Sequence, residues 1–245
     1  MSYVELHCHS AYSFLDGASH PVELAAAAAE QGHSALALTD HDSLHGAMEM
    51  AQALRPLGVR SITGAELTLD DGSHLTLLCE NREGYTNLCR LITGAHWRTR
   101  RWAREGWTEP ASAQRAFRRP GQDALDAQPT ITLAELEHNA AGLVCLSGCA
   151  RDGVVARRIE AGDHPGAATV ARRLLVAFGP ERFRIELQRP WWQGDRRRNR
   201  LLSELAERLG VPCVATGNVH AHERARVALQ DALVAVRLGA TLDET

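Results

Sequence analysis

Short apolar runs of strand length alternate with longer segments of helical periodicity along most of the chain, and this alternation limits the folds open to it. Ala35–Thr39 and Leu143–Leu146 are continuous apolar runs bounded by turn residues, which is typical of buried strands. The alanine-rich segment Val22–Gln31 follows an N-cap signal at Ser19 and ends at Gly32, as helices do. The alternation predicts an α/β fold, a mostly parallel sheet wrapped by helices and closed or nearly closed into a barrel.

The other expected elements keep this order, and 245 residues suit one large domain over residues 1–245. Helix Thr132–His138 begins with a capping box, because Glu135 follows Thr132 by three residues. Further strands are expected at Tyr3–Leu6, Val59–Ile62, Ala65–Leu69, Leu75–Cys79, Phe183–Leu187 and Val211–Thr216. Further helices are expected at Ser43–Leu54, Glu83–Ile92, Val154–Ala161, Ala167–Phe178, Asp195–Leu209 and Glu223–Val236.

The composition excludes several classes of protein. Hydrophobic residues make up 44% and charged residues 23% of the chain, a globular balance that excludes disordered and fibrous proteins. No apolar run is long enough for a membrane span, and the first residues do not resemble a secretory signal. The six cysteines have no CxxC spacing, so a disulfide framework is not expected. We therefore expect a soluble, cytoplasmic protein with no membrane partner.

One stretch, at about residues 97–129, interrupts the alternation and is expected to leave the barrel as an excursion. Arginines and tryptophans are interleaved at its start, an arrangement that binds single-stranded nucleic acid through phosphate contacts and base stacking. The alternative is a solvated loop whose tryptophans fold back on the body. The candidate DNA-binding residues are Arg98, Arg100, Arg101, Trp102 and Arg104.

Residue types that ligate metals recur at the ends of the expected strands. His7 and His9 are separated by one residue at the end of the first strand, so both imidazoles can face one metal ion. The carboxyl ends of barrel strands meet at one rim, where α/β barrels place their chemistry. The sequence therefore predicts a metal site at this rim, for which the other candidates are Asp16, His41, Glu66 and His220.

Five motifs, in this order along the chain, resemble the PHP (polymerase and histidinol phosphatase) domain. They are His7-Cys8-His9-Ser10, Phe14-Leu15-Asp16-Gly17, Thr39-Asp40-His41, Gly64-Ala65-Glu66 and Val219-His220. Longer stretches, such as ELHCHSAYSFLDGAS and HLTLLCENREGYTNLCRLIT, resemble the PHP domain at the N-terminus of bacterial DNA polymerase III alpha subunits, especially error-prone alpha-like polymerases. The resemblance spans residues 3–244.

The resemblance implies a distorted (β/α)7 barrel with up to three divalent metals, which would be zinc, manganese or iron. Among the implied ligands are Cys149, which composition alone marks as a buried thiol, and His96, close to the position of another family histidine. His74, at the start of a strand, is interpreted as a packing residue. The implied ligands are His7, His9, Asp16, His41, Glu66, His96, Cys149, Asn218 and His220.

Asn218 departs from the family pattern, because members with an intact site have an aspartate there. An amide can ligate through its oxygen but adds no negative charge, so the expected activity is open. The chain can be a metal-dependent phosphoesterase, with a DNA 3′ end as substrate for a 3′–5′ exonuclease, or a non-catalytic scaffold beside a polymerase core. A stand-alone phosphatase similar to histidinol phosphatases is the third reading. No catalytic residue is assigned beyond the metal ligands, and no polymerase core is present in these residues.

Overall fold

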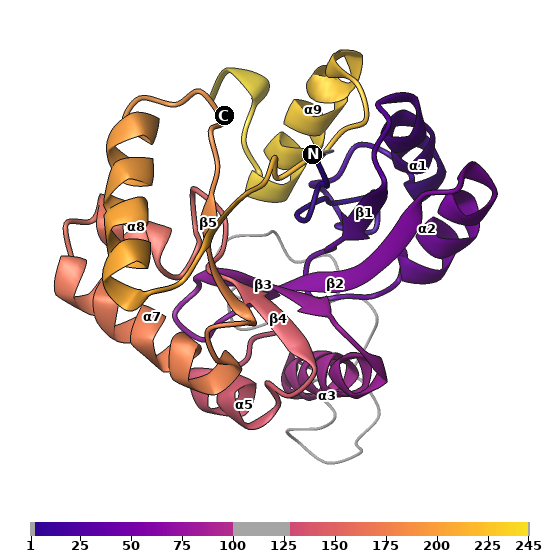
Figure 1. Ribbon diagram of the computed structural model, residues 1–245. Helices are drawn as coiled ribbons and strands as arrows, with labels where there is room; N and C mark the ends of the chain where they lie inside the picture. Colours follow the sequence, from indigo (N-terminus) through magenta and orange to yellow (C-terminus); the bar gives the residue numbers. More distant parts are fainter. Residues whose placement is uncertain (1–2, 100–127, 245) are drawn as a thin grey trace, which may run out of the picture.

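A computed structural model describes residues 3–99 and 128–244 and contains one curled mixed sheet in these ranges (Figure 1). Strand β1 is parallel to β2, and β4, β5 and β6 are parallel to one another. Strand β3 is antiparallel to both of its neighbours, β2 and β4. In spatial order the strands are β1 (Ala35–Leu38), β2 (Arg60–Thr68), β3 (His74–Cys79), β4 (Leu143–Leu146), β5 (Phe183–Leu187) and β6 (Cys213–Ala215).

The segment 5–9 lies between the two ends of this sheet and closes it. Glu5 forms a parallel bridge with Leu36 of β1, and Cys8 forms one with Val219, which follows β6. The His9 main-chain N–H donates to the Val219 carbonyl at 2.7 Å. The expected distorted barrel is confirmed, with this N-terminal segment completing the ring formed by the six strands.

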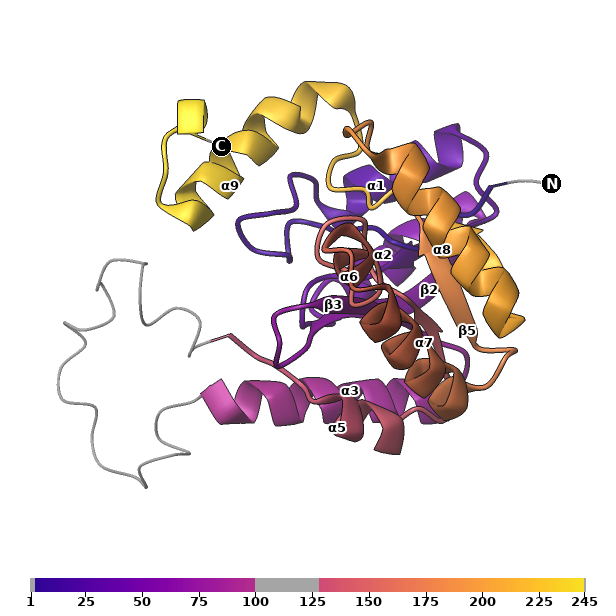
Figure 2. The same cartoon turned by 90° about the vertical axis from the view of Figure 1, so that its left-hand side faces the viewer.

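Helices cover the outside of the strands, and α9 lies on the opposite side of the barrel from α3 and α5 (Figures 1 and 2). The α-helices are α1 (Pro21–Glu30), α2 (Ala47–Leu54), α3 (Arg82–Thr99), α5 (Leu133–His138), α6 (Ala156–Glu160), α7 (His164–Phe178), α8 (Asp195–Leu209) and α9 (Val227–Leu238). Within the described ranges, the short 3-10 turns are η1 (Arg55–Leu57), η4 (Arg224–Arg226) and η5 (Leu242–Glu244). In the described ranges, no helix is both long and apolar enough to cross a bilayer.

Side-chain alternation along the strands separates an apolar outer layer from a polar interior. Leu75 and Leu77 of β3 are fully buried and belong to the main hydrophobic cluster, which includes residues of α3, α7 and α8. Thr76, between them, points the other way, and its hydroxyl lies 3.2 Å from His7 Nδ1. Glu186 of β5 likewise contacts His7. The barrel interior thus contains a buried polar network around His7, together with a small apolar cluster that includes Ala37, Leu78 and Leu146.

Several expected elements differ in extent from the observed ones. The two expected strands 59–62 and 65–69 are one strand, β2, in which Gly64 allows close approach to the Leu77 carbonyl. The helix expected from Ser43 begins only at Ala47. Helix α3 continues past Ile92 to Thr99 and so includes the start of the excursion. Residues 100–127 of that excursion lie outside the described residues.

Side-chain hydrogen bonds at the N-cap help to set where helices α5 and α1 begin. The capping box of α5 is confirmed, because Thr132 Oγ1 accepts from the Glu135 N–H at 3.2 Å and Glu135 Oε2 accepts from the Thr132 N–H at 2.8 Å. The cap expected at Ser19 is wrong by one residue. His20 is the N-cap of α1, whereas the Ser19 hydroxyl contacts His222 Nδ1 at 2.7 Å.

Candidate metal centre

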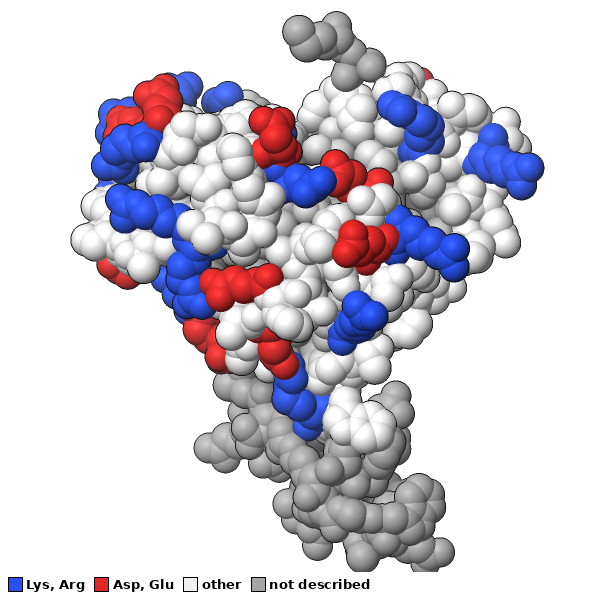
Figure 3. All heavy atoms as spheres, turned by 60° about the horizontal axis from the view of Figure 1, so that its bottom comes forward, with Lys and Arg blue, Asp and Glu red and all other residues white. Residues whose placement is uncertain are grey.

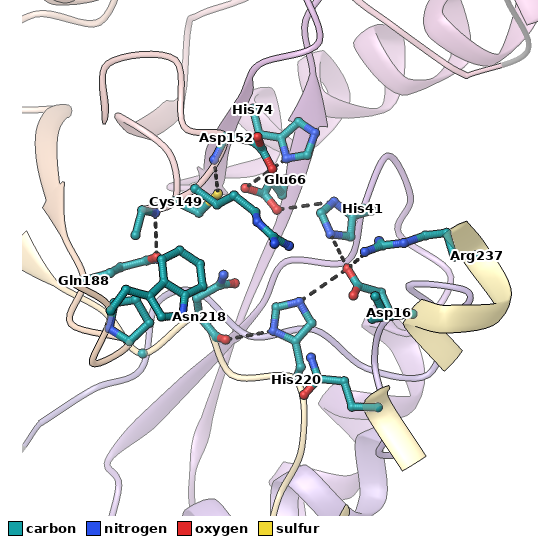
Figure 4. Close-up of a pocket in the computed structure, with 17 residues that line it drawn as sticks. Asp16, His41, Glu66, His74, Cys149, Asp152, Gln188, Asn218, His220 and Arg237 are labelled. Carbon is teal, nitrogen blue, oxygen red and sulfur yellow. Dashed lines mark hydrogen bonds and ion pairs between the residues drawn. The ribbon is translucent and has the colours of Figure 1, made fainter. Parts of the chain in front are cut away.

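A pocket of about 300 Å³ opens at the rim where the parallel strands end. His41 follows β1, Glu66 lies near the end of β2, and Asn218 and His220 follow β6. His74 reaches the same rim from the start of β3, because β3 runs in the opposite direction. Figure 4 shows these side chains converging on one cavity from different strands.

Glu66 is at the centre of the histidine cluster. Its Oε2 atom lies 3.5 Å from His7 Nε2, 3.4 Å from His9 Nε2 and 3.3 Å from His41 Nδ1. Its Oε1 atom lies 3.7 Å from His74 Nδ1. Burial opposes ionisation, but His7 and His41 outweigh it and hold the pKa of the Glu66 carboxyl well below its usual value. Glu66 is therefore an anion at neutral pH.

The hydrogen bonds of His7 and His9 direct both Nε2 atoms to the same point. His7 Nδ1 lies 2.7 Å from Glu186 Oε1, a carboxylate that can only accept, so this nitrogen carries the proton. The Ser13 hydroxyl donates to Asp40 Oδ1 and therefore accepts from His9 Nδ1, 3.2 Å away. The two Nε2 atoms are then 3.1 Å apart, beside the Glu66 carboxylate. Carboxylate-oriented imidazoles of this kind are typical of metal-ligating histidines.

When no metal is bound, the surroundings shift the pKa values of His7 and His9 in opposite directions. Burial lowers the pKa of His7, but the Glu186 and Glu66 carboxylates outweigh it and raise this pKa well above its ordinary value. Burial, together with His41 and His220, lowers the pKa of His9 well below it. The close Nε2 contact is then a hydrogen bond from His7 to His9, and a metal ion at this point would replace the shared proton.

Asp16 forms the second anionic centre of the pocket. Its Oδ2 atom lies 3.1 Å from His41 Nε2, 3.4 Å from His220 Nε2 and 3.0 Å from Arg237 Nη1 of α9. Burial raises the pKa of Asp16, but hydrogen bonds from His220 and His41 outweigh it and hold this pKa well below its usual value. The His9 ring stacks between the rings of His41 and His220, with centroids 4.4 and 4.5 Å away.

Two buried oxygen atoms at the site lack hydrogen-bond donors. Glu66 Oε1 and Asn218 Oδ1 are both buried and have no hydrogen-bond partner among the described residues. Asn218 has a positive φ of 51°, a conformation that asparagine tolerates better than most residues. Buried oxygens without donors are costly unless a cation lies beside them. The donor set therefore fits divalent metals, and it forms three overlapping groups: His7, His9 and Glu66; His9, His41 and His220; and His41, Glu66 and His74.

A further shell of buried polar residues holds the ligand candidates in place. Glu186 Oε1 also accepts from Gln188 Nε2 at 2.7 Å and from the Thr216 hydroxyl. Asp40 accepts from the main-chain N–H of Ser10 at 2.7 Å and so fixes the loop after His9. Glu186 was not among the residues predicted from the sequence. The signal was available, because a glutamate between Ile185 and Leu187 in an alternating strand must face away from the apolar layer.

Residues 5–190 match the family model for the PHP domain. The chain belongs to the PHP family. It is 43% identical over 246 residues to an error-prone DNA polymerase of Symbiobacterium thermophilum, covering 100% of this chain and 22% of that protein. It is 38% identical to error-prone DNA polymerases of Mycobacterium tuberculosis H37Rv and Anaeromyxobacter sp. strain K, over 99% and 98% of this chain. The chain spans about a fifth of the length of these relatives. It covers 21% of the Mycobacterium tuberculosis protein and 19% of the Anaeromyxobacter protein.

Solved structures support the same fold at low sequence identity. An amidohydrolase from Chromobacterium violaceum with bound sulfate has a TM-score of 0.58 at 19% identity, covering 89% of this chain and 87% of that one. A putative metal-dependent phosphoesterase from Bifidobacterium adolescentis has a TM-score of 0.54 at 18% identity, covering 95% and 96%. The expected PHP resemblance, including its likeness to error-prone polymerases, is confirmed.

Four of the expected ligands of this PHP domain, Asp16, Asn218, Cys149 and His96, are not members of the three donor groups, although the first three line the same pocket. Cys149 lines the pocket, but its Sγ atom accepts from the Asp152 N–H at 3.4 Å. Burial, with a smaller contribution from Glu66, raises the pKa of this thiol well above its ordinary value. His96 on α3 lines a different groove, and its Nε2 atom contacts the Asp42 carbonyl at 2.7 Å.

His74 lines the PHP pocket with its Nδ1 atom 3.7 Å from Glu66 Oε1, whereas His96, predicted as a ligand from the sequence, lines the other groove. His74 was interpreted from the sequence as a packing residue at the start of a strand, and it reaches this rim because β3 is antiparallel to both of its neighbours. The signal for an antiparallel strand was present, since residues 69–73 are too few for the crossover that parallel strands need. The Leu69 N–H donates to the Ser73 carbonyl at 2.7 Å in this tight connection.

The expected DNA-binding residues of the excursion are mostly outside the described part of the chain. Arg98 is described, and its Nη1 atom forms an ion pair with Glu135 Oε1 at 2.6 Å. Arginine and acidic side chains are interspersed on the face in Figure 3. The other candidates, Arg100, Arg101, Trp102 and Arg104, lie outside the described residues.

Proposed function

We propose that this PHP domain binds divalent metals in the rim pocket and hydrolyses phosphate esters there. The observation that carries the proposal is the convergence of the His7 and His9 Nε2 atoms on the Glu66 carboxylate. Up to three ions, zinc, manganese or iron, would be held by the three donor groups with Asp16. Asn218 and Cys149 lie close enough to the pocket to complete this ligand set.

The protein's own groups would bind and orient the phosphate ester. When bound, the metals would neutralise phosphoryl oxygens and lower the pKa of a water molecule toward neutrality. Arg151 and Arg237 line the same pocket and supply cationic donors for the developing negative charge. Glu186 keeps the His7 ring fixed, so that the ligand geometry does not have to reorganise during the reaction.

The relatives suggest the setting of this reaction. We propose that the chain is the PHP part of an error-prone DNA polymerase acting in the cytoplasm, with a polymerase core as its partner. The substrate would then be a DNA 3′ end, and the activity a 3′–5′ exonuclease. Support comes from 43% identity to one such polymerase over 100% of this chain.

A second candidate function, a non-catalytic scaffold for the polymerase, is favoured by two observations. Asn218 provides an amide where an intact family site has an anion. Arg237 already forms an ion pair with Asp16, one of the expected ligands. Each lowers the negative charge available to a dication, which matters more for catalysis than for folding.

Elemental analysis of the purified chain, with Asn218→Asp and His9→Ala beside it, tests these readings. The phosphoesterase proposal expects two or more metals per chain and hydrolysis of a labelled oligonucleotide that His9→Ala abolishes. Metal without hydrolysis in the unmodified chain, with hydrolysis gained in Asn218→Asp, would support the scaffold. Absence of metal in both the unmodified chain and Asn218→Asp would overturn the ligand assignment.

A further inference from the structure

Two tryptophans lie beside the metal pocket on the loop between β5 and α8. Trp192 lines the pocket directly, together with Arg151. The Arg151 guanidinium carbon lies 5.6 Å from the centroid of the Trp192 ring, and that of Arg189 lies 4.1 Å from the Trp191 ring. We propose that Trp192 and Arg151, assisted by Trp191 and Arg189, form a stacking platform for the terminal base of a single-stranded nucleic acid.

The exposure of these rings is unusual for tryptophan. Trp191 is 79% exposed and Trp192 is 48% exposed, so neither ring contributes its full apolar area to the core. Trp191 also has a positive φ of 67°, a left-handed conformation that costs free energy for a bulky residue. The fold therefore holds two large aromatic surfaces in solvent beside the proposed reaction site.

The loop is anchored at both ends, so the platform is in place before any ligand binds. The main-chain N–H of Trp192 donates to Asp195 Oδ2 at 3.0 Å. Asp195 is buried, and its Oδ1 atom forms an ion pair with Arg198 Nη2 at 2.7 Å. At the other end, Gln188 Oε1 accepts from the Ala150 N–H at 2.8 Å. That contact ties the tryptophan loop to the loop that carries Arg151. Preorganisation of this kind reduces the entropy lost on binding.

The platform indicates the class of phosphate ester that the pocket would take. A small phosphate needs only cationic donors, and Arg151 and Arg237 in the pocket supply them. A planar aromatic surface adjoining those cations adds affinity for a nucleobase attached to the phosphate. Arginine beside aromatic rings binds single strands with little sequence preference, since every base has a face that can stack. This inference refines the substrate of the proposed function, but the binding itself requires neither metal nor hydrolysis.

Fluorescence anisotropy in EDTA, with the 245-residue chain, tests the platform without catalysis. The probes are a labelled dT octamer and the same octamer lacking the base of its 3′ nucleotide. The unmodified chain should bind the complete octamer at least about fivefold more tightly. Trp192→Ala should lose that preference, and Trp192→Phe should restore most of it. Tyr85→Ala, at another exposed aromatic residue, is the matched control and should keep the full preference.

Two results would overturn the platform: equal binding of both probes by the unmodified chain, or an unchanged base preference in Trp192→Ala. Far-ultraviolet circular dichroism shows whether each variant is folded, and Trp192→Phe retains a test if the alanine variant unfolds. Failure of the metal and hydrolysis assays with an intact base preference would overturn the proposed function and leave the platform standing. The reverse pattern would remove the platform and leave the phosphoesterase proposal.

Discussion

Replacing Glu186 with glutamine removes one negative charge from the barrel interior and keeps the shape of the side chain. The carboxylate is fully buried, and its Oε1 atom accepts from His7 Nδ1, from Gln188 and from Thr216. A glutamine carbonyl at the same position can still accept these bonds. Its amide nitrogen would take the place of Oε2, which has no partner in the described structure. The variant therefore removes the charge of Glu186 and keeps the hydrogen bonds that it accepts, while adding one buried amide group without an acceptor.

We expect the Glu186→Gln variant to bind divalent metals more weakly than the unmodified chain. Mutation of a carboxylate that accepts from a metal-ligating histidine typically weakens metal binding about 10- to 100-fold, and here the loss would come from the charge, which makes the imidazole a more basic ligand. At about 1.4 kcal/mol per factor of ten, that corresponds to about 1.4 to 2.8 kcal/mol. Glu186→Ala should instead affect folding, because it removes the acceptor shared by three buried donors, of which Gln188 Nε2 keeps the Thr216 hydroxyl as a partner. Each buried donor left unpaired costs about 1 to 3 kcal/mol.

Competition of zinc or manganese against a chromophoric chelator measures the affinity, and urea denaturation of the metal-free chain measures the free energy of unfolding. Glu181→Gln is the matched control, since Glu181 is exposed just before the same strand. The argument is wrong if Glu186→Gln binds metal as tightly as the unmodified chain. It is also wrong if the glutamine variant loses as much stability as the alanine variant.

Three further outcomes are expected. His74→Ala should lower the number of metals per chain in elemental analysis, whereas His96→Ala should leave it unchanged; the opposite pattern would restore the assignment made from the sequence. Thr132→Ala should lower the free energy of unfolding by about 1 kcal/mol in urea denaturation, because it removes the cap that accepts from Glu135, and an unchanged midpoint would contradict that cap. In the metal-free chain, Glu186→Gln should lower the free energy of unfolding more at pH 5.5 than at pH 8.5. The carboxylate raises the pKa of His7 in the folded state, so this stabilisation is complete below the unfolded pKa and disappears as the pH rises through the folded pKa. Thermal unfolding in EDTA at both pH values measures it, and an equal difference at the two would rule out the linkage.

Local patterns in the sequence were sufficient for the order of elements and for most of the candidate ligands. Apolar runs and turn residues predicted β4 and β5 at their observed bounds, and α8 begins and ends where its periodicity does. These features depend on neighbours a few residues apart, so a single sequence contains them. The closed sheet also followed, because alternating strands and helices have few ways to bury their apolar faces.

Which residues come together at the site depended on the tertiary structure. His74 joins Glu66 because β3 is antiparallel to β2, so that the start of β3 lies at the rim of the pocket. Glu186 reaches His7 across 179 residues of sequence, through the closure of the barrel. The sequence by itself determined the fold class and the types of residue available as ligands. Only the packed barrel decided which of them meet, because contacts between distant segments depend on strand direction and register rather than on local pattern.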